Sequence, residues 1–100
     1  MQDLQKKKRW ESEKYRVWVK SLPSCISGIE PAGDCHHLKG HGFGGTVKAP
    51  DWAAIPLTRE EHERFHSSGI RTWEEQYGSQ FEHVVRTLGK AIQEGIIGEL

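Results

Sequence analysis

The 100-residue sequence contains no asparagine, two cysteines and one methionine, and it lacks any long apolar run. No segment approaches the ~18 consecutive apolar residues that a membrane-spanning helix needs, so we expect no membrane association. The Lys/Arg-rich start is not followed by the apolar core of a secretory signal, which favours a cytoplasmic protein. Two cysteines, Cys25 and Cys35, are too few for a disulfide scaffold, so free thiols are expected.

An excess of charge of one sign is also lacking, because 14 Lys and Arg residues balance 14 Asp and Glu residues. No global basic character therefore indicates nucleic-acid binding. The distribution is uneven, since residues 1–20 carry seven basic side chains against three acidic ones, whereas residues 74–100 carry five glutamates against two basic residues. A basic N-terminal part and an acidic C-terminal part suit a protein that binds a polyanion through its N-terminal part. A solvated basic helix gives the same pattern.

A chain of this length makes one domain, residues 1–100, with a single modest core. Residues 3–20 predict a helix in a basic N-terminal segment, 1–22, because good helix formers alternate there with apolar residues at helical spacing. Leu22 and Pro23 end this helix, and the Ser-, Gly- and Pro-rich stretch after them predicts a loop up to residue 34.

Two strands are predicted around a loop that holds four of the eleven glycines. The strands are expected at 34–38 and 52–57, with the Gly-rich loop at 39–51 between them. Pro56 argues for an edge position or a strand end, because proline cannot donate to the ladder.

Three helices are then predicted by the same capping-box pattern, which begins at Thr58, Thr72 and Ser79 and places a glutamate three residues later. The last of these helices has one apolar stripe, which we expect to pack on the core or on a partner. The stripe comprises Phe81, Val84, Val85, Leu88, Ile92 and Ile96. His83 beside it, and Trp52 and Trp73 elsewhere, are assigned to packing.

Four histidines fall into two pairs, His36–His37 and His62–His66. Four residues advance a helix by about 400°, so His62 and His66 lie one turn apart on one face and can chelate a metal. Adjacent residues on a strand point to opposite faces, so one of His36 and His37 can be a ligand while the other faces a substrate as a base.

The order of these features resembles the HNH, or His-Me finger, nucleases over residues 23–70. The stretches CHHLKGHGFGG, IPL and EHERFH look most like those of small phage-encoded HNH nucleases of recombination and repair. The resemblance implies an α+β fold with a ββα-metal core at 23–70, in which the Gly-rich loop lies within the hairpin. The N-terminal helix and two C-terminal helices, at 71–100, would flank this core.

By this resemblance His36, His62 and His66 would bind the metal and His37 would be the general base. The family's central asparagine has no counterpart, and Asp51 is the nearest candidate to brace the loop. Many relatives also carry a structural zinc knuckle made of two C-x-x-C pairs. Those places read SCIS at 24–27 and TREE at 58–61, so one metal ion is expected, with Cys25 and Cys35 as small apolar residues.

The implied activity is metal-dependent hydrolysis of DNA phosphodiester bonds, giving 5′-phosphate and 3′-hydroxyl ends in a bacterial or phage-infected cell. One divalent ion is expected, Mg, Mn, Ni, Co or Zn, and a nitrogen-rich ligand set favours Zn, Ni, Co or Mn over Mg. DNA is the expected partner, together with a recombination, packaging or replication protein of phage. Candidate phosphate contacts are Lys39, His41, Lys48, Arg59 and Arg64.

Two other readings remain open. The segment from His62 to His66 also matches H-E-x-x-H, the zinc metalloprotease helix, with Glu63 as general base. Thr72 then stands where the third histidine of the longer metzincin pattern belongs, and it is a poor zinc ligand. The other reading is a non-catalytic metal-bound module that holds DNA, which would not need His37 as a base.

Overall fold

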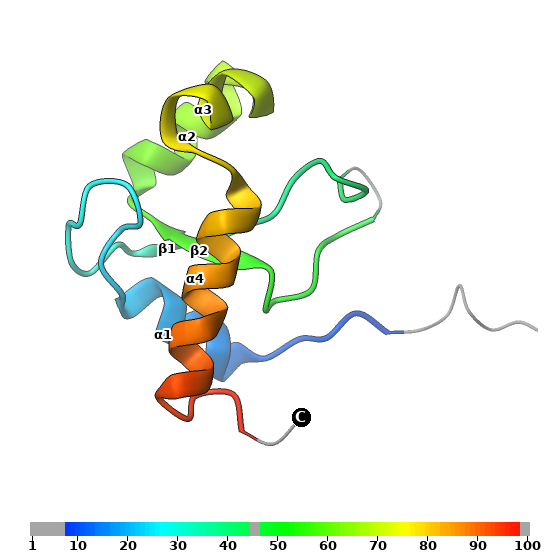
Figure 1. Cartoon of the computed structure of the whole chain (residues 1–100), viewed down its shortest axis with the longest axis vertical. Coiled ribbons are helices and arrows are strands. Elements are labelled where there is room, and N and C mark those ends of the chain that lie inside the picture. Colours follow the sequence, from blue (N-terminus) through cyan, green and yellow to red (C-terminus); the bar gives the residue numbers. More distant parts are fainter. Residues whose placement is uncertain (1–7, 45–46, 99–100) are drawn as a thin grey trace, which may run out of the picture.

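The computed structural model describes residues 8–44 and 47–98. Within them the chain forms four helices and a two-stranded antiparallel sheet, which confirms the α+β class (Figure 1). No helix in this part of the chain is long and apolar enough to cross a membrane. The elements in order are α1 (Glu13–Ser21), β1 (Asp34–His37), β2 (Ala54–Leu57), α2 (Arg59–Ser68), α3 (Ile70–Tyr77) and α4 (Gln80–Gln93).

The two strands are connected by the Gly-rich loop and pair with His36 opposite Ile55. All four residues of β2 are buried, whereas in β1 only His36 is fully buried. The Leu38 N–H donates to Ala53 O at 2.9 Å, so the pairing continues one residue past β1. The predicted strands are therefore correct in position and slightly too long. Both strands of a two-stranded sheet are edges, which is where Pro56 was expected.

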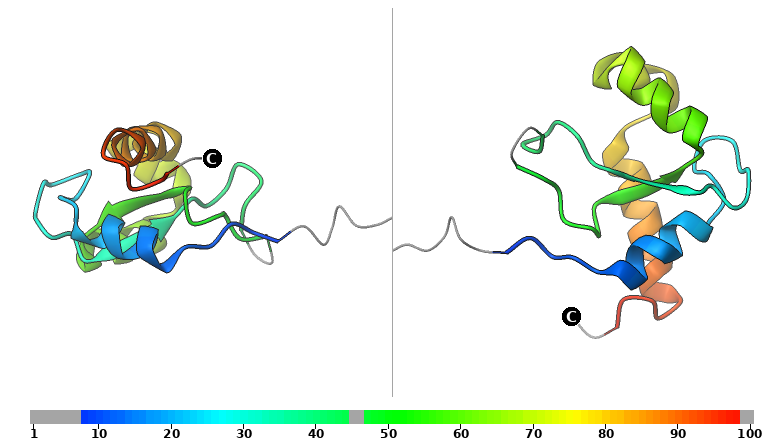
Figure 2. Two further views of the ribbon diagram at one scale, coloured as in Figure 1. Left: turned by 90° about the horizontal axis from the view of Figure 1, so that it is seen from below. Right: turned by 180° about the vertical axis from the view of Figure 1, so that it is seen from behind.

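The sheet lies between α1 and α4, and α2 and α3 lie beyond one end of it (Figure 2). Trp73 of α3 is buried as predicted and joins the main core. That core comprises Leu38, Ala49, Ala53, Ile55, Leu57, Phe65, Trp73 and Val84. A second, smaller cluster joins Tyr15 and Val19 of α1 to Ala91 of α4, with Cys35 packed against it. Neighbouring residues of β1 thus lie in different environments, so His36 and Cys35 have different surroundings.

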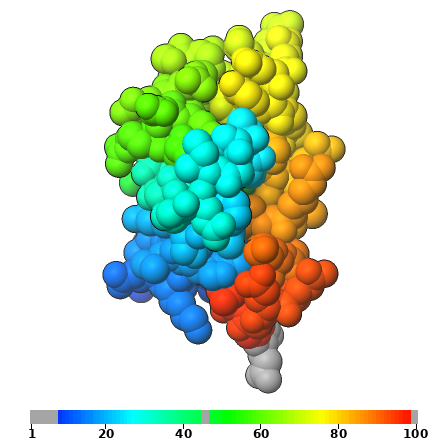
Figure 3. Space-filling view, turned by 90° about the vertical axis from the view of Figure 1, so that its left-hand side faces the viewer, coloured from blue at the N-terminus to red at the C-terminus, as the bar shows by residue number. Residues whose placement is uncertain are grey.

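The segment between α1 and β1 lies across the edge of the molecule, between α2 and α1 (Figure 3). The Cys25 N–H donates to Pro56 O at 3.0 Å, and the Ser24 hydroxyl donates to a Glu61 carboxylate oxygen at 2.6 Å. Both cysteines are free and partly buried, as expected.

The predicted N-terminal helix at 3–20 is wrong in its first part. Residues 8–12 are not helical, and α1 begins after Ser12, whose hydroxyl accepts from the Tyr15 N–H at 3.1 Å. The preceding segment bonds to the loop before β2 instead, since the Asp51 N–H donates to Trp10 O at 2.9 Å. These long-range bonds replace the hydrogen bonds that another helical turn would form. Residues 3–7 lie outside the described residues.

The three predicted helix starts have different outcomes. Thr58 and Glu61 form the full capping box of α2, as predicted. Ser79 caps α4, but its hydroxyl accepts from the Phe81 N–H and not from that of Glu82. The prediction at Thr72 is wrong, because the cap of α3 is Gly69, three residues earlier, and the helix begins at Ile70. Gly69 has φ 88°, a glycine conformation that turns the chain directly from α2 into α3.

The apolar stripe predicted for the last helix is correct only in part. α4 ends at Gln93, so Ile96 lies outside it, and Val84 faces the core. Phe81, Val85 and Ile92 are instead exposed by 45%, 65% and 53%. Trp52, which was assigned to packing, is 40% exposed.

Candidate functional site

Three histidines from two elements converge at the junction of β1 and α2. His36 comes from β1, while His62 and His66 lie one turn apart on α2. One ligand nitrogen from each lies within 4.8 Å of the other two. Tertiary structure therefore brings together the three residues expected as ligands. Among the described residues, His36, His62 and His66 form the group of metal-binding side chains (His, Cys, Asp or Glu) that is close enough to share an ion.

The buried amide of Gln80 determines which nitrogen of His36 carries the proton. The Lys39 N–H donates to Gln80 Oε1 at 3.1 Å, and Gln80 Nε2 donates to Lys39 O at 2.9 Å and to Glu74 Oε2 at 3.1 Å. This network leaves one orientation for the amide. His36 Nε2 lies 3.0 Å from the same Oε1, so it must be the donor.

His36 Nδ1 therefore has a lone pair, and this atom is buried without a hydrogen-bond partner in the described structure. Burial lowers the pKa of His36 to about 4, so its imidazole is neutral near pH 7. A buried polar atom without a partner is costly unless something binds it. Its position beside His62 and His66 fits a metal ion.

His62 is oriented by Asp34, a residue that the sequence reasoning missed. His62 Nδ1 lies 3.0 Å from Asp34 Oδ2, and the Arg59 guanidinium lies 3.2 Å from the same oxygen. A carboxylate only accepts, so Nδ1 donates, and the neutral form of His62 has its lone pair on Nε2. Asp34 stands two residues before His36, hence on the same face of the strand, and this spacing was the signal that could have identified it.

His66 completes the group at the solvent-exposed side. Burial and the neighbouring His62 lower the pKa of His66, which favours the neutral form that binds a metal. Carboxylate or amide acceptors on the second nitrogen, as found on His36 and His62, commonly orient metal-binding histidines. Three imidazole ligands fit Zn, Ni or Co better than Mg, which prefers oxygen ligands.

His37 points away from these three residues and contacts Asp51. His37 Nε2 lies 2.8 Å from Asp51 Oδ1, and the Ser12 N–H donates to Oδ2 at 2.7 Å. Arg9 and Arg16 also bond to this carboxylate. Burial raises the pKa of Asp51, but the hydrogen bonds from His37, Ser12 and Arg16 outweigh it and lower the pKa to about 2. Asp51 is therefore an acceptor and His37 Nε2 donates, so in the neutral imidazole the lone pair lies on His37 Nδ1.

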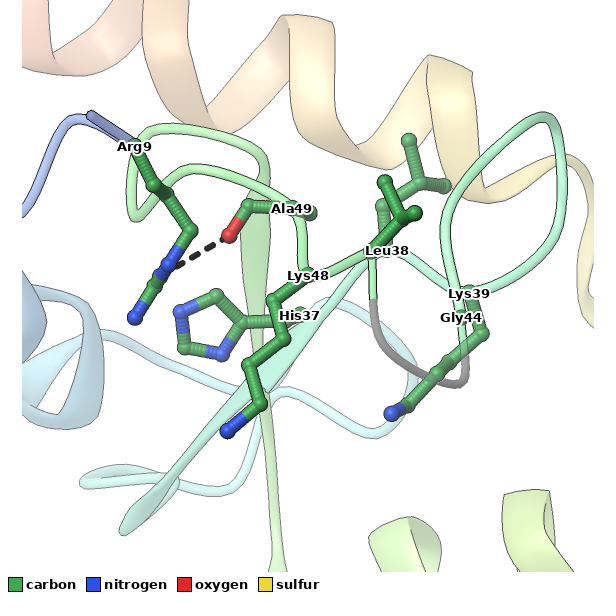
Figure 4. Close-up of a pocket in the computed structure, with 8 residues that line it drawn as sticks. Arg9, His37, Leu38, Lys39, Gly44, Lys48 and Ala49 are labelled. Atoms are coloured by element: carbon green, nitrogen blue, oxygen red, sulfur yellow. Dashed lines mark hydrogen bonds between the residues drawn. The ribbon is translucent and has the colours of Figure 1, made fainter. Parts of the chain in front are cut away.

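A basic cavity of about 260 Å³ opens beside His37 (Figure 4). Arg9, Lys39 and Lys48 line it together with His37, and Arg9 donates to Ala49 O at 2.9 Å. Three cationic side chains around one cavity favour an anion. Lys39 and Lys48 were expected near phosphate, whereas Arg9 was noted only as part of the basic N-terminus. Its role depends on contacts across 40 residues of chain, which no local pattern indicates.

The other candidate phosphate contacts lie elsewhere. His41 is 3.4 Å from Glu74, and its ring lies 4.5 Å from that of Phe81. Arg59 is paired with Asp34 beside His62, and Arg64 lines a surface depression on α2 together with Glu63. His83 is buried and bonded to Tyr77 O at 2.9 Å, which confirms its structural assignment.

Residues 3–95 match a family model described as a protein of unknown function, DUF968. The chain belongs to this family. It is also 42% identical over 95 residues to an uncharacterized protein, YdfU, of Escherichia coli (strain K12). That match covers 94% of this chain and 27% of YdfU, so the chain spans about a quarter of the length of this relative. No solved structure matches the chain significantly. Neither description names an activity, so a function must be argued from the site.

Proposed function

We propose that the protein is a metal-dependent DNA endonuclease of the HNH, or His-Me finger, type. The observation that carries the proposal is the buried, unpartnered Nδ1 of His36 beside His62 and His66. A structural cluster of histidines would satisfy that atom internally. The residue next to it in sequence, His37, is held by a carboxylate and lines a cavity with three cationic side chains.

The order of the elements supports a ββα-metal unit as the finer description of the fold. β1 supplies His36 and His37, the Gly-rich loop leads to β2, and α2 supplies His62 and His66. The α2 capping box places the first α2 ligand immediately after Glu61, so the helix start and the ligand position are linked. Asp51, which stands in place of the family's asparagine, would brace the loop through its contacts with His37 and Ser12.

The proposed reaction uses His37 Nδ1 as the general base. A water molecule loses a proton to Nδ1 while its oxygen bonds to phosphorus, the bond from phosphorus to the 3′-oxygen breaks, and that oxygen takes a proton from solvent. Asp51 holds the imidazole in the required tautomer and stabilises the imidazolium that forms. Arg9, Lys39 and Lys48 bind and orient the phosphate. A divalent ion held by His36, His62 and His66 would stabilise the negative charge that develops on the phosphate and the 3′-oxygen.

The test is nicking of supercoiled plasmid with Mg, Mn, Ni, Co or Zn, with and without chelator. We expect metal-dependent nicking that falls at least ~100-fold in His37→Ala, the usual minimum for loss of a general base. Metal binding should persist in this variant. Glu63→Ala is the matched control, because Glu63 is exposed on α2 between the two ligands and is the base of the protease reading.

Each alternative has a distinct outcome in the same experiment. Metal and DNA binding by the folded protein without nicking by any ion would refute the nuclease and favour the non-catalytic module. Casein cleavage that is lost in Glu63→Ala would favour the protease. In the structure, the third side chain that meets His62 and His66 is His36. This supports the nuclease reading, which uses His36, over the protease reading, which does not.

A further inference from the structure

α4 presents two separate apolar surfaces, and the protein's own core uses only one of them. Val84 and Ala91 are buried against the rest of the chain. A second surface, here called the outer strip, consists of Phe81, Val85, Leu88 and Ile92. At 100° per residue these four positions fall within an arc of roughly 60° on the side of the helix next to the buried face. α4 lies at the outside of the molecule, so this strip is accessible (Figure 2).

One end of the outer strip forms a socket. Its lining is almost entirely apolar, comprising Trp10, Trp52, Leu88, Ile92 and Ile97, and its volume is about 190 Å³. Trp10 and Trp52 are 41% and 40% exposed although they flank this cavity. Phe81 stands at the opposite end of the strip with 45% of its surface exposed. The same helix therefore carries an aromatic knob at its start and an apolar socket near its end.

We propose that the outer strip is the interface of a homodimer, in which α4 of one copy packs antiparallel to α4 of the second about a twofold axis. The strip positions are spaced by four, three and four residues, the spacing of a coiled-coil seam. In an antiparallel pair Phe81 then meets Ile92 of the second copy, and Val85 meets Leu88. The Phe81 ring thus enters the socket between Trp10 and Trp52, and the twofold axis forms the same contact twice.

The exposed apolar area is sufficient for such a dimer. Phe81, Val85, Ile92, Trp10 and Trp52 are each exposed by 40–65%. At ~200 Å² for a fully exposed large side chain, they expose roughly 500 Å² per copy. Two copies would bury roughly 1,000 Å², near the lower limit for a specific interface, so a reversible dimer is expected. Gly89 beside the strip has open space in front of its Cα, which lets a second helix approach closely.

The first test is sedimentation equilibrium of the full chain, with circular dichroism to check the fold. We expect a concentration-dependent dimer whose dissociation constant rises roughly 30- to 100-fold in Val85→Glu and in Phe81→Ala, as for hot-spot residues at an interface. Val17→Glu is the matched control, because Val17 is 57% exposed on α1, away from the strip, and should leave the dimer unchanged. A wild-type protein that stays monomeric up to ~100 μM, or a dimer unaffected by Val85→Glu, would overturn the proposal.

The second test determines the helix orientation. Val85→Lys and Leu88→Glu should each weaken the homodimer, because each places two charges against apolar partners. An equimolar mixture of the two variants should form heterodimers, since one Val85–Leu88 contact becomes a Lys–Glu pair and the other keeps the wild-type residues. A parallel pair would put position 85 against position 85, so mixing would relieve like-charge repulsion but would form no Lys–Glu contact across the helices, and added salt would not weaken the mixed dimer. Failure of the folded variants to associate when mixed would overturn the antiparallel arrangement.

Discussion

The buried amide of Gln80 leads to a direct prediction about metal affinity. Gln80 is fully buried, and its Oε1 accepts from His36 Nε2 and from the Lys39 N–H. Gln80→Met keeps the length of the side chain and removes both acceptor and donor. His36 then loses the partner that keeps its proton on Nε2 and its lone pair on Nδ1. We expect weaker metal binding without loss of any ligand.

The expected magnitude follows from the role of such partners. Loss of an acceptor on the second nitrogen of a metal-binding histidine typically weakens binding 10- to 100-fold, or about 1.4–2.8 kcal/mol. The variant should also be less stable, because the partly buried Lys39 N–H and C=O lose their partners, and about 1–3 kcal/mol is the upper range for a fully buried unpaired group. Gln80→Glu separates the two effects. Its carboxylate still accepts from His36 and Lys39, so metal affinity should stay near wild type, while repulsion from Glu74 lowers stability.

The assay is competition for Zn²⁺ or Co²⁺ with a chromophoric chelator, at a temperature where all variants are folded. Gln76→Met, at an exposed position of α3, is the matched control. ¹⁵N NMR of the metal-free wild type should show His36 protonated on Nε2, a readout that a purely structural role of Gln80 would not predict. The reasoning is refuted if folded Gln80→Met binds the ion within about threefold of wild type, or if His36 carries its proton on Nδ1.

Three further predictions concern stability and thiol chemistry. The pKa of Asp51 is lowered from 3.8 to about 2, so its ionised carboxylate stabilises the fold. This contribution, roughly 2 kcal/mol, is fully present above about pH 3.8 and is lost as the pH falls through 2. Urea denaturation should show this loss in wild type and not in Asp51→Asn. Thr58→Ala should lower the free energy of unfolding by about 1 kcal/mol by removing the α2 cap, whereas Thr72→Ala, inside α3, should change it by less than about 0.5 kcal/mol. Burial raises the pKa of Cys25 to about 12 and that of Cys35 to about 11. Iodoacetamide at pH 8 should therefore label the native thiols far more slowly than the urea-unfolded thiols. Equal labelling rates would contradict this prediction.

Local periodicity was sufficient to predict how the two histidine pairs are arranged. A spacing of four residues on a helix and adjacency on a strand are geometric statements about a few residues, and the backbone obeys them wherever those elements form. His62 and His66 accordingly lie on one face of α2, while His36 and His37 have different surroundings. Asp34 was within reach of the same reasoning, because it shares a strand face with His36.

Contacts between distant segments could not be predicted in this way. Gln80 meets His36 across 44 residues, and nothing in the local sequence of α4 marks it as the partner of a histidine. The N-terminal helix was overextended for a related reason. Residues 8–12 have good helix formers, but their hydrogen bonds go to the 49–51 segment, and tertiary contacts outweigh helix propensities of a few tenths of a kcal/mol per residue.

The start of α2 is joined to the segment before β1 by a buried hydrogen bond. The segments 24–27 and 58–61, where the resembling nucleases carry cysteine pairs, are joined by the hydrogen bond from Ser24 to Glu61. The same Glu61 oxygen accepts from the Thr58 N–H at 2.8 Å, and both Ser24 and Glu61 are buried. Burial strengthens such bonds and makes their loss costly, so they hold the two segments together without an ion. Because His62 follows Glu61 directly, this contact also positions the first α2 ligand, and the metal site we propose would need no second metal to hold α2 in place.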